Sequence, residues 1–506
     1  MKTRGGRILF ALLSGVLAAV SFPKFNLSFF IWISLIPLFL ILIRNKSGTG
    51  FFYGLLAGFA YYAVILYWTP SVPAHYGNLS PVLSILIYLL LVFYLALYWA
   101  AFGFLFSAIH RKFPGLAFLA APFIWTGLEY GITYVFTGFP WGLLGYSQSG
   151  NLPFLQTAAV AGVYGLSFLI VLLQSAFVLS IVRRKRAPFF AALALILAVH
   201  SAGFLTLKKV MPSKQTFPAA VIQGNVSSDI YWEAMSQEEI FKLFDHHLDL
   251  SRQAYEQGAR LIIWPEFTEP LCFSCPEGFY QTMEDRLIGF VRETQSSLLL
   301  GTNETAGQRP DILYYNTALA LHPDLSQSRY YKMHLVPFGE YTPYKKIFSF
   351  IESVTHAIGD VTPGTQPVLH EFRGVRFGSP ICYEVIFPNL VRTFVRKGAG
   401  FLVTITNDGW YGTSPAPYQH FLIAAFRAVE NRRFLLRAAT TGISGVVDPY
   451  GRILSRSRLM TSDVLNADVT PSETLTFYTR TGDILPLVSL TLTAALFMLA
   501  VFKKAT

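Results

Sequence analysis

Three residues in the second half of the chain, Glu266, Lys332 and Cys382, are of the types that carry out nucleophilic catalysis. Glu266 follows the apolar run LIIWP, where a carboxyl is partly desolvated and suits a general base. Cys382 follows GSPI and precedes Tyr383 and Glu384, unlike a cysteine inside a core run. Lys332 supplies a cation, and a thiol beside a cation and a base forms a thiolate readily.

Each of these residues also has an ordinary structural explanation. A glutamate at the end of a strand can cap it or form a salt bridge, and a single cysteine is commonly a small core hydrophobe. A lysine within YYKMHLVPFGEY can extend over aromatic rings to reach water. Taken one at a time, the three residues therefore decide nothing.

The elements that must position these residues form an alternating pattern of strands and helices. The pattern predicts a helix that begins at a capping box, Ser236 and Glu239, and stops at Gly258, and another over about 387–397. It also predicts a turn at DPYG, 448–451. Predicted strands cover 217–226, 261–266, 297–303, 375–383 and 401–407. Alternation over about 260 residues favours a layered α/β domain.

Taken together and in this order, Glu266, Lys332 and Cys382 resemble the nitrilase (carbon–nitrogen hydrolase) superfamily, whose members use a Glu–Lys–Cys triad. Within it, the chain is similar to the membrane-embedded apolipoprotein N-acyltransferases, and the similarity covers nearly the whole chain. The matching segments are WPE (264–266), KMHLVPFGEYTP (332–343), ICYE (381–384), NDGWY (407–411) and FPWG (139–142). The resemblance implies an α-β-β-α sandwich for the catalytic domain.

The resemblance also implies roles for individual residues. Cys382 is expected to be the nucleophile, Glu266 the general base and Lys332 the cation that stabilises the oxyanion. Further essential positions of the family, one assisting carboxylate and three residues that shape the substrate pocket, fall here on Glu340 and on Trp232, Tyr383 and Glu384.

The implied reaction moves an acyl chain from a phospholipid to Cys382 as a thioester. The chain then passes to the α-amine of a diacylglyceryl-modified cysteine of an apolipoprotein, the last step of lipoprotein maturation. No metal and no diffusible cofactor is expected. A rival enzyme function is a membrane-tethered amidase or nitrilase with water as acceptor, and a rival of another class is a transporter with an outer binding domain.

The composition excludes a purely soluble protein and a disordered one. Of 506 residues, 53% are hydrophobic and only 14% are charged, whereas soluble domains are about 25% charged. The net charge of +11 arises in residues 1–207, which hold twelve Lys or Arg and a single acid, Glu129. These charges lie in short loops between apolar segments, so we expect no nucleic-acid partner.

Eight segments are apolar enough to be candidates for crossing a bilayer, which needs about 20 residues. The first is short and follows basic residues, so a signal peptide is the alternative for it. The eight segments are 8–22, 27–43, 51–69, 81–110, 115–136, 154–182, 188–207 and 484–502.

Loop charges predict the orientation of these spans. With the N-terminus placed inside, the inner segments hold thirteen Lys or Arg and the short outer loops hold one, Lys24. Seven spans would then form residues 1–207, an extracytoplasmic catalytic domain 208–483, and a last span with an inner tail 484–506. The expected location is the bacterial inner membrane, with the catalytic domain on the periplasmic side.

Other features leave alternatives open. Glu129 falls within a predicted span, where a functional and a structural role are both open. Cys272 and Cys275 could form a disulfide. The apolar segments 271–280 and 347–358 are expected either to pack on the domain core or to form a mobile arm that admits lipid. The phospholipid head group, the acyl length and the oligomeric state do not follow from the sequence.

Overall fold

The computed structural model describes residues 3–208, 216–226, 235–266, 278–307, 312–343 and 361–503. The chain divides into two compact units. The first comprises 1–70, 80–210 and 476–506, and the second comprises 71–79 and 211–475.

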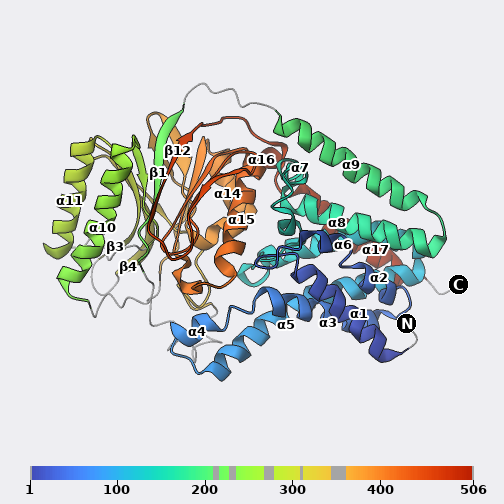
Figure 1. The fold of residues 1–506 in the computed structure, drawn as a ribbon. Helices are drawn as coiled ribbons and strands as arrows, with labels where there is room; N and C mark the ends of the chain where they lie inside the picture. Colours follow the sequence, from blue (N-terminus) through green and yellow to red (C-terminus); the bar gives the residue numbers. More distant parts are fainter. Residues whose placement is uncertain are drawn as a thin grey trace. The chain divides into compact units, whose positions relative to one another are not determined.

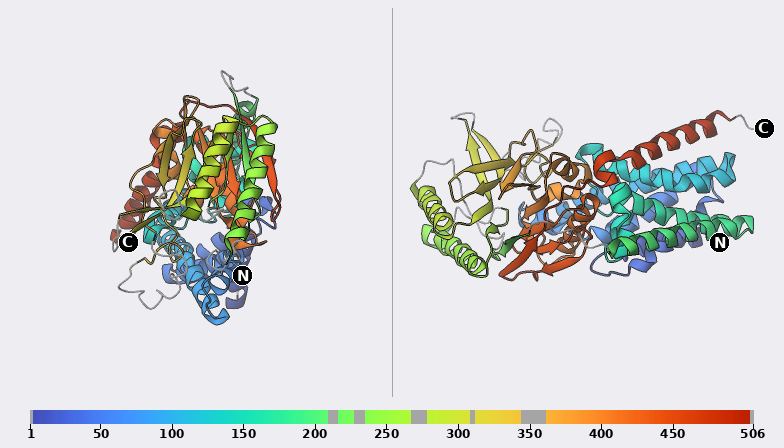
Figure 2. Two further views of the ribbon diagram at one scale, coloured as in Figure 1. Left: turned by 90° about the vertical axis from the view of Figure 1, so that its left-hand side faces the viewer. Right: turned by 90° about the horizontal axis from the view of Figure 1, so that it is seen from above.

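The first unit is helical, and six of its helices are long and apolar enough to cross a membrane. The C-terminal helix α17 packs against α6 and α5, so the end of the chain returns to its first half. Figures 1 and 2 show these helices running side by side. The six are α3 (Ser47–Ile65), α5 (Pro81–Lys112), α6 (Pro114–Tyr134, continued by a 3-10 turn to Thr137), α8 (Ala158–Arg183), α9 (Ala187–Leu207) and α17 (Ile484–Phe502).

The two other predicted spans form shorter helices. Helix α1 covers Arg4–Ala19, and its 16 residues extend about 24 Å. The segment predicted at 27–43 is broken into a 3-10 turn, Ser28–Trp32, and the short helix α2, Ile36–Leu42. Pro37 lies in the first turn of α2, where a proline suits a helix start but cannot continue an earlier helix. Among the described residues, six of the eight candidate segments thus form long helices, and the other two form shorter ones.

The second unit contains two six-stranded sheets. In each, three central strands run parallel and the flanking pairs are antiparallel. The first sheet has the order β12 (Asp463–Val469), β1 (Phe217–Gln223), β2 (Leu261–Ile263), β3 (Ser297–Ala306), β4 (Leu313–Leu321), β5 (Gln327–Tyr331). The second has the order β11 (Ile453–Arg456), β10 (Gly445–Val447), β9 (Leu435–Ala439), β8 (Phe401–Thr406), β7 (Val375–Gly378), β6 (Leu369–Phe372).

Helices cover the outer face of each sheet, which confirms the expected α-β-β-α layering (Figure 1). Helices α10 (Gln237–Glu256) and α11 (Gly278–Thr294) cover the first sheet, and α14 (Pro388–Arg396) and α15 (Ala416–Asn431) cover the second. The predicted capping box of α10 is present: Ser236 Oγ accepts from the Glu239 N–H, and the Glu239 carboxylate accepts from the Ser236 N–H.

The inner faces of the two sheets meet in an aromatic core. Phe217 on β1 contacts Phe372 and Phe401 of the second sheet, each with ring centroids 5.1 Å apart. Phe401 in turn stacks on Phe377 at 4.7 Å. Burial of this apolar surface holds the sheets together and thereby sets the distance between the strand ends of one sheet and those of the other.

Two predicted strands end earlier than the sequence indicated. Strand β2 stops at Ile263, three residues before Glu266, and β7 stops at Gly378, four residues before Cys382. Pro265 and Pro380 explain the early ends, because a proline has no N–H to donate to a neighbouring strand. Both candidate residues therefore lie on short irregular segments beyond the strands.

Several expectations fall on residues outside the described ranges. These are the pocket role of Trp232, the pairing of Cys272 with Cys275, and the apolar segments 271–277 and 347–358. Residues 278–280, predicted as the end of the first of these segments, form the start of α11.

Phe217→Ala tests the contact between the sheets. Loss of this ring, which is 4% exposed, should lower the free energy of unfolding by about 3–5 kcal/mol because a cavity opens between the sheets. Urea unfolding followed by tryptophan fluorescence measures the change. Leu454→Ala, at a residue of β11 that is 55% exposed, should cost less than about 1 kcal/mol. Equal effects of the two substitutions would contradict this account of the core.

Candidate active site

Glu266 is buried beyond the end of β2, and three donors hold its carboxylate. Its Oε1 accepts from Lys332 Nζ at 3.2 Å and from Asn316 Nδ2 at 2.8 Å. Its Oε2 accepts from the backbone N–H of Asn407, at the end of β8 in the second sheet, at 2.8 Å. The carboxylate therefore bridges the two sheets, and its orientation is fixed from both sides.

Lys332 follows β5 and points its ammonium group between two carboxylates. Nζ lies 3.2 Å from Glu266 Oε1 and 2.8 Å from Glu340 Oε1, and the side chain is only 1% exposed. Burial by itself lowers the pKa of Lys332, but the charges of Glu266 and Glu340 outweigh burial and hold the pKa well above its usual value. The lysine is therefore a fixed cation and not a proton acceptor.

Glu340 is the second carboxylate beside Lys332, and it also holds the backbone of its own segment at Val336. Its Oε1 accepts from Lys332 and from Asn316 Nδ2, the latter at 2.9 Å, while its Oε2 accepts from the Val336 N–H at 2.7 Å. Asn316 on β4 thus donates to both carboxylates. Sequence reasoning missed Asn316, although an asparagine directly before the mostly apolar run TALAL was a usable signal.

Cys382 lies at the first position of a short 3-10 turn, Cys382–Ile386, with φ at +50°. This left-handed conformation is costly for a residue with a Cβ, and such strain is found at active sites. Burial raises the pKa of the Cys382 thiol well above its usual value, and the charge of Glu266 adds to the rise, while Lys332 opposes it. The resting group is a neutral thiol, so the attack on a substrate requires a base.

Glu384 ties the segment of Lys332 to the turn of Cys382. Its Oε1 accepts from the Tyr330 hydroxyl at 2.7 Å and from the backbone N–H groups of Met333 and His334 at 2.7 and 3.0 Å. Its Oε2 accepts from the Ile381 N–H at 2.7 Å. Burial raises the pKa of Glu384 to about 7, and the donors oppose this rise because they stabilise the carboxylate.

Tyr383 is also buried, and its ring centroid lies 5.2 Å from that of Phe387 and 5.7 Å from that of His334. The structure therefore brings together Glu266, Lys332, Glu340 and Glu384 and places Tyr383 next to Cys382. Trp232, the remaining predicted position, lies outside the described residues.

A second buried polar group, formed by Asp408, His420 and Arg437, contacts Cys382 through His420. Arg437 Nη2 donates to Asp408 Oδ2 at 2.7 Å, and His420 Nδ1 lies 2.8 Å from Asp408 Oδ1. Burial by itself raises the pKa of Asp408, but Arg437 and His420 outweigh burial and lower it to about 2. Sequence reasoning missed His420 and Arg437, and the arginine within the buried strand LLRAA was the available signal.

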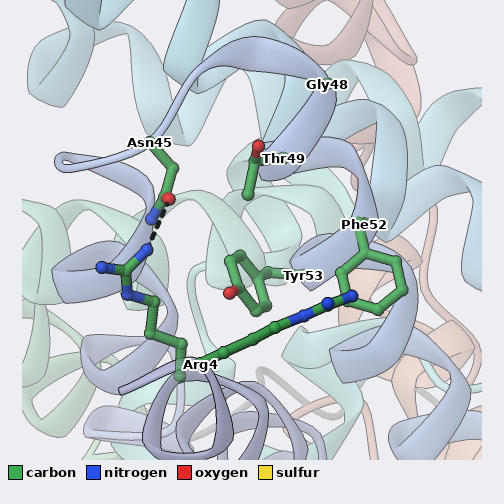
Figure 3. A pocket seen from close by; sticks show the side chains of 7 residues that line it. Arg4, Asn45, Gly48, Thr49, Phe52 and Tyr53 are labelled. Carbon is green, nitrogen blue, oxygen red and sulfur yellow. Dashed lines mark hydrogen bonds between the residues drawn. The ribbon is translucent and has the colours of Figure 1, made fainter. Parts of the chain in front are cut away.

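Among the residues that the structure describes, no group of three His, Cys, Asp or Glu side chains is placed to hold a metal ion. A cavity of about 630 Å³ lies in the first unit, lined by residues of α1 and the start of α3 (Figure 3). Its charged groups are Arg4 and Arg7, and Arg7 donates to Asn45 at 3.2 Å. It contains no residue of the predicted triad.

Comparison with known proteins covers nearly the whole chain. Residues 14–176 match the apolipoprotein N-acyltransferase N-terminal domain, and residues 218–477 match the carbon–nitrogen hydrolase family. The apolipoprotein N-acyltransferase of Geobacter metallireducens is 40% identical over 94% of this chain and 92% of its own length. This chain belongs to the apolipoprotein N-acyltransferase family.

Other similarities are more distant. The apolipoprotein N-acyltransferase of Photobacterium profundum is 31% identical over 94% of this chain and 92% of its own length. Among solved structures, an amidase from Nesterenkonia sp. is 22% identical, and the similarity covers 54% of this chain and 94% of the amidase chain, with a TM-score of 0.39.

As a family member with six helices, among the described residues, that are able to span a bilayer, the chain is a membrane protein.

Removal of single charges near the Cys382 thiol gives a test of the site. In this apolipoprotein N-acyltransferase family member, Glu266→Gln removes a negative charge that raises the pKa of Cys382, so the thiolate should form at lower pH, by about one to three units. Lys332→Met should shift thiolate formation to higher pH. The pH dependence of alkylation of Cys382 by iodoacetamide, read by peptide mass spectrometry, measures both shifts. Shifts in the opposite directions would contradict the assignment of charges.

Proposed function

We propose that this chain transfers a fatty acyl group from a membrane phospholipid, through a thioester on Cys382, to the α-amine of the diacylglyceryl-modified cysteine of an apolipoprotein. Its membership of the apolipoprotein N-acyltransferase family makes it an acyltransferase. The observation that carries the mechanism is the buried lysine held between two carboxylates, whose charges act on a thiol at a strained turn.

In the first half-reaction, Glu266 takes the proton of the Cys382 thiol, and the sulfur attacks the carbonyl carbon of the phospholipid acyl ester. The tetrahedral oxyanion is stabilised by the Lys332 ammonium and by a backbone N–H. When the carbon–oxygen bond breaks, the proton held by Glu266 passes to the departing lysophospholipid. The products of this step are a thioester on Cys382 and a free lysophospholipid.

In the second half-reaction, the α-amine of the acceptor attacks the thioester. Glu266 takes a proton from the amine, an amide forms, and the sulfur leaves and regains its proton. A thioester suits this transfer because amines attack it readily, while an apolar pocket excludes the water that would hydrolyse it. The Lys332 cation is positioned in advance and serves both tetrahedral intermediates without rearrangement.

The membrane helices explain how such an enzyme reaches its donor. Each CH₂ removed from a bilayer costs about 0.8 kcal/mol, so extraction of a 16-carbon chain into water costs about 12 kcal/mol. A catalytic unit joined to membrane-spanning helices can take the ester at the bilayer surface and avoid this cost.

Acyl-enzyme formation tests the proposed mechanism. Purified protein incubated with phospholipid should carry a fatty-acyl thioester on Cys382, and Cys382→Ala should carry none. Addition of a diacylglyceryl-modified peptide with a free α-amine should yield the acylated amide.

The matched control for this test is Cys272→Ser, which removes a thiol to which the family resemblance assigns no role, and it should acylate at the rate of the unaltered protein. Turnover in Cys382→Ala would overturn the mechanism. Release of free fatty acid in place of the amide would indicate a carbon–nitrogen hydrolase with water as acceptor.

We propose that the second unit lies on the periplasmic side of the bacterial inner membrane. The support is the charge bias of thirteen inner Lys or Arg against one outer. The result is the same whether the two short segments, 4–19 and 28–42, both cross or both do not, because two crossings return the chain to the same side.

Reporter fusions test this orientation. A reporter that is active only outside the cytoplasm should be active when fused near residue 300 and inactive when fused after Arg186. The reverse pattern would overturn the orientation together with the assignment of a lipoprotein acceptor, and full-length expression of both fusions is verified by immunoblot.

A further inference from the structure

The buried group formed by Asp408, His420 and Arg437 reaches the nucleophile at two points. His420 Nε2 lies 3.3 Å from the backbone carbonyl oxygen of Cys382. The Thr406 hydroxyl is in hydrogen-bond contact with the Cys382 thiol and donates to Asp408 Oδ1 at 3.3 Å. All of these side chains are buried, and the catalytic steps derived above use none of them.

The partners of the imidazole determine which nitrogen carries a proton. A carbonyl oxygen can only accept, so the contact with Cys382 is a hydrogen bond only when Nε2 is protonated. The other nitrogen, Nδ1, has two partners: Arg437 Nη2 at 3.0 Å can only donate, and the Asp408 Oδ1 carboxylate oxygen at 2.8 Å can only accept. A neutral ring with its proton on Nε2 accepts from Arg437 at Nδ1, and a protonated ring donates from Nδ1 to Asp408. Both states keep the donor that faces Cys382.

The remaining state keeps the hydrogen bond from Nδ1 to Asp408 Oδ1 at 2.8 Å but loses the donor to Cys382. A neutral ring with its proton on Nδ1 would place a lone pair of Nε2 against the carbonyl oxygen of Cys382 and an N–H against the guanidinium of Arg437. Nε2 therefore donates to Cys382 in two of the three protonation states of the ring. The third is disfavoured by Arg437, whose guanidinium is held by the 2.7 Å ion pair with Asp408 and faces Nδ1.

The residue that faces His420 Nε2, Cys382, has a strained backbone. Cys382 has φ at +50°, a conformation that persists only where the surroundings fix it. On the N-terminal side, Glu384 Oε2 accepts from the Ile381 N–H at 2.7 Å. On the C-terminal side, His420 Nε2 lies 3.3 Å from the Cys382 carbonyl oxygen. The N–H one residue before Cys382 and the carbonyl of Cys382 itself thus each face a separate buried side chain.

We propose that His420 is a positioning residue, which holds the Cys382 carbonyl through Nε2–H so that the sulfur stays in the orientation from which it attacks the acyl ester. The proposal rests on the proposed function only in taking Cys382 as the nucleophile. The Asp408–Arg437 pair acts through His420, and Glu384 supplies the matching anchor on the other side of the turn.

Two substitutions of similar size distinguish the roles of the two nitrogens of the His420 ring. In His420→Gln the side-chain amide nitrogen can take the place of Nε2 and still donate to Cys382. In His420→Asn the amide nitrogen takes the place of Nδ1, and the donor to Cys382 is lost. The rate of Cys382 acylation by a short-chain p-nitrophenyl ester is measured on the purified full-length protein in detergent.

We expect His420→Gln to retain acylation within about threefold of the unaltered protein, and His420→Asn to lose at least tenfold in kcat with KM changed less than twofold. The thermal unfolding midpoints of the two variants should agree within a few degrees. His246→Gln, at a histidine of α10 outside the site, is the control and should acylate at the unaltered rate.

A merely structural role predicts equal losses in both His420 variants, in proportion to their loss of thermal stability. That result, or an Asn variant as fast as the Gln variant, would overturn the proposal. Should His420→Gln not fold, Thr406→Val gives the second measurement. It keeps the shape of Thr406 but removes its contact with the thiol, and loss of kcat is again expected at unchanged KM, whereas an unchanged kcat would overturn the role of the buried group.

The ester assay separates this proposal from the function proposed above. It reports on the Cys382 sulfur alone and needs neither a phospholipid nor a lipoprotein. Failure of the unaltered protein to acylate a diacylglyceryl-modified peptide, with normal acylation by the ester, would refute the acceptor and leave the role of His420 standing.

Discussion

The ion pair of Lys332 with Glu266 and Glu340 is the constraint around which the catalytic unit is arranged. Taking three charged groups out of water costs several kcal/mol each, and their attraction repays this only when the geometry is good and every remaining lone pair finds a donor. Asn316 and the backbone N–H groups of Asn407 and Val336 provide those donors. Loss of any one of the three charged side chains leaves buried charge without its full compensation. In the proposed mechanism, this arrangement keeps the cation and the base in place beside the thiol before a substrate arrives, as electrostatic preorganisation requires.

The two sheets together position the residues of that ion pair. Glu266 lies beyond a strand of the first sheet, and its carboxylate accepts from the N–H of Asn407 beyond a strand of the second. The apolar contacts of Phe217 with Phe372 and Phe401 keep the sheets at the separation at which these strand ends meet. Hydrophobic burial is not directional, so it supplies cohesion, while the buried hydrogen bonds supply the exact register of the catalytic groups.

The strained turn at Cys382 shows how the surrounding structure supports an unfavourable local conformation. A φ of +50° costs of order 1 kcal/mol or more for a residue with a side chain. The carboxylate of Glu384 accepts from the N–H one residue earlier, and the imidazole of His420 contacts the Cys382 carbonyl. Glu384 also binds the backbone at Met333 and His334, directly after Lys332. One carboxylate therefore couples the position of Lys332 to the position of Cys382, although 50 residues separate it from the nearer of these backbone groups.

The sequence by itself determined the features that depend on neighbouring residues. Long apolar runs give the six long helices, Ser236 and Glu239 give the helix start, and the motifs around Glu266, Lys332 and Cys382 identify the family. It did not show that the segment 27–43 is interrupted, and it overestimated the lengths of two strands, because Pro37, Pro265 and Pro380 act on the backbone within runs that remain apolar. Only the tertiary structure decided that Asn316 donates to both carboxylates, that Glu384 binds two segments, and that His420, with Arg437 beside it, contacts Cys382. The reason is that these contacts join residues far apart in the chain, and which side chains meet depends on the register of the strands and the packing of the two sheets, neither of which is encoded in a local pattern.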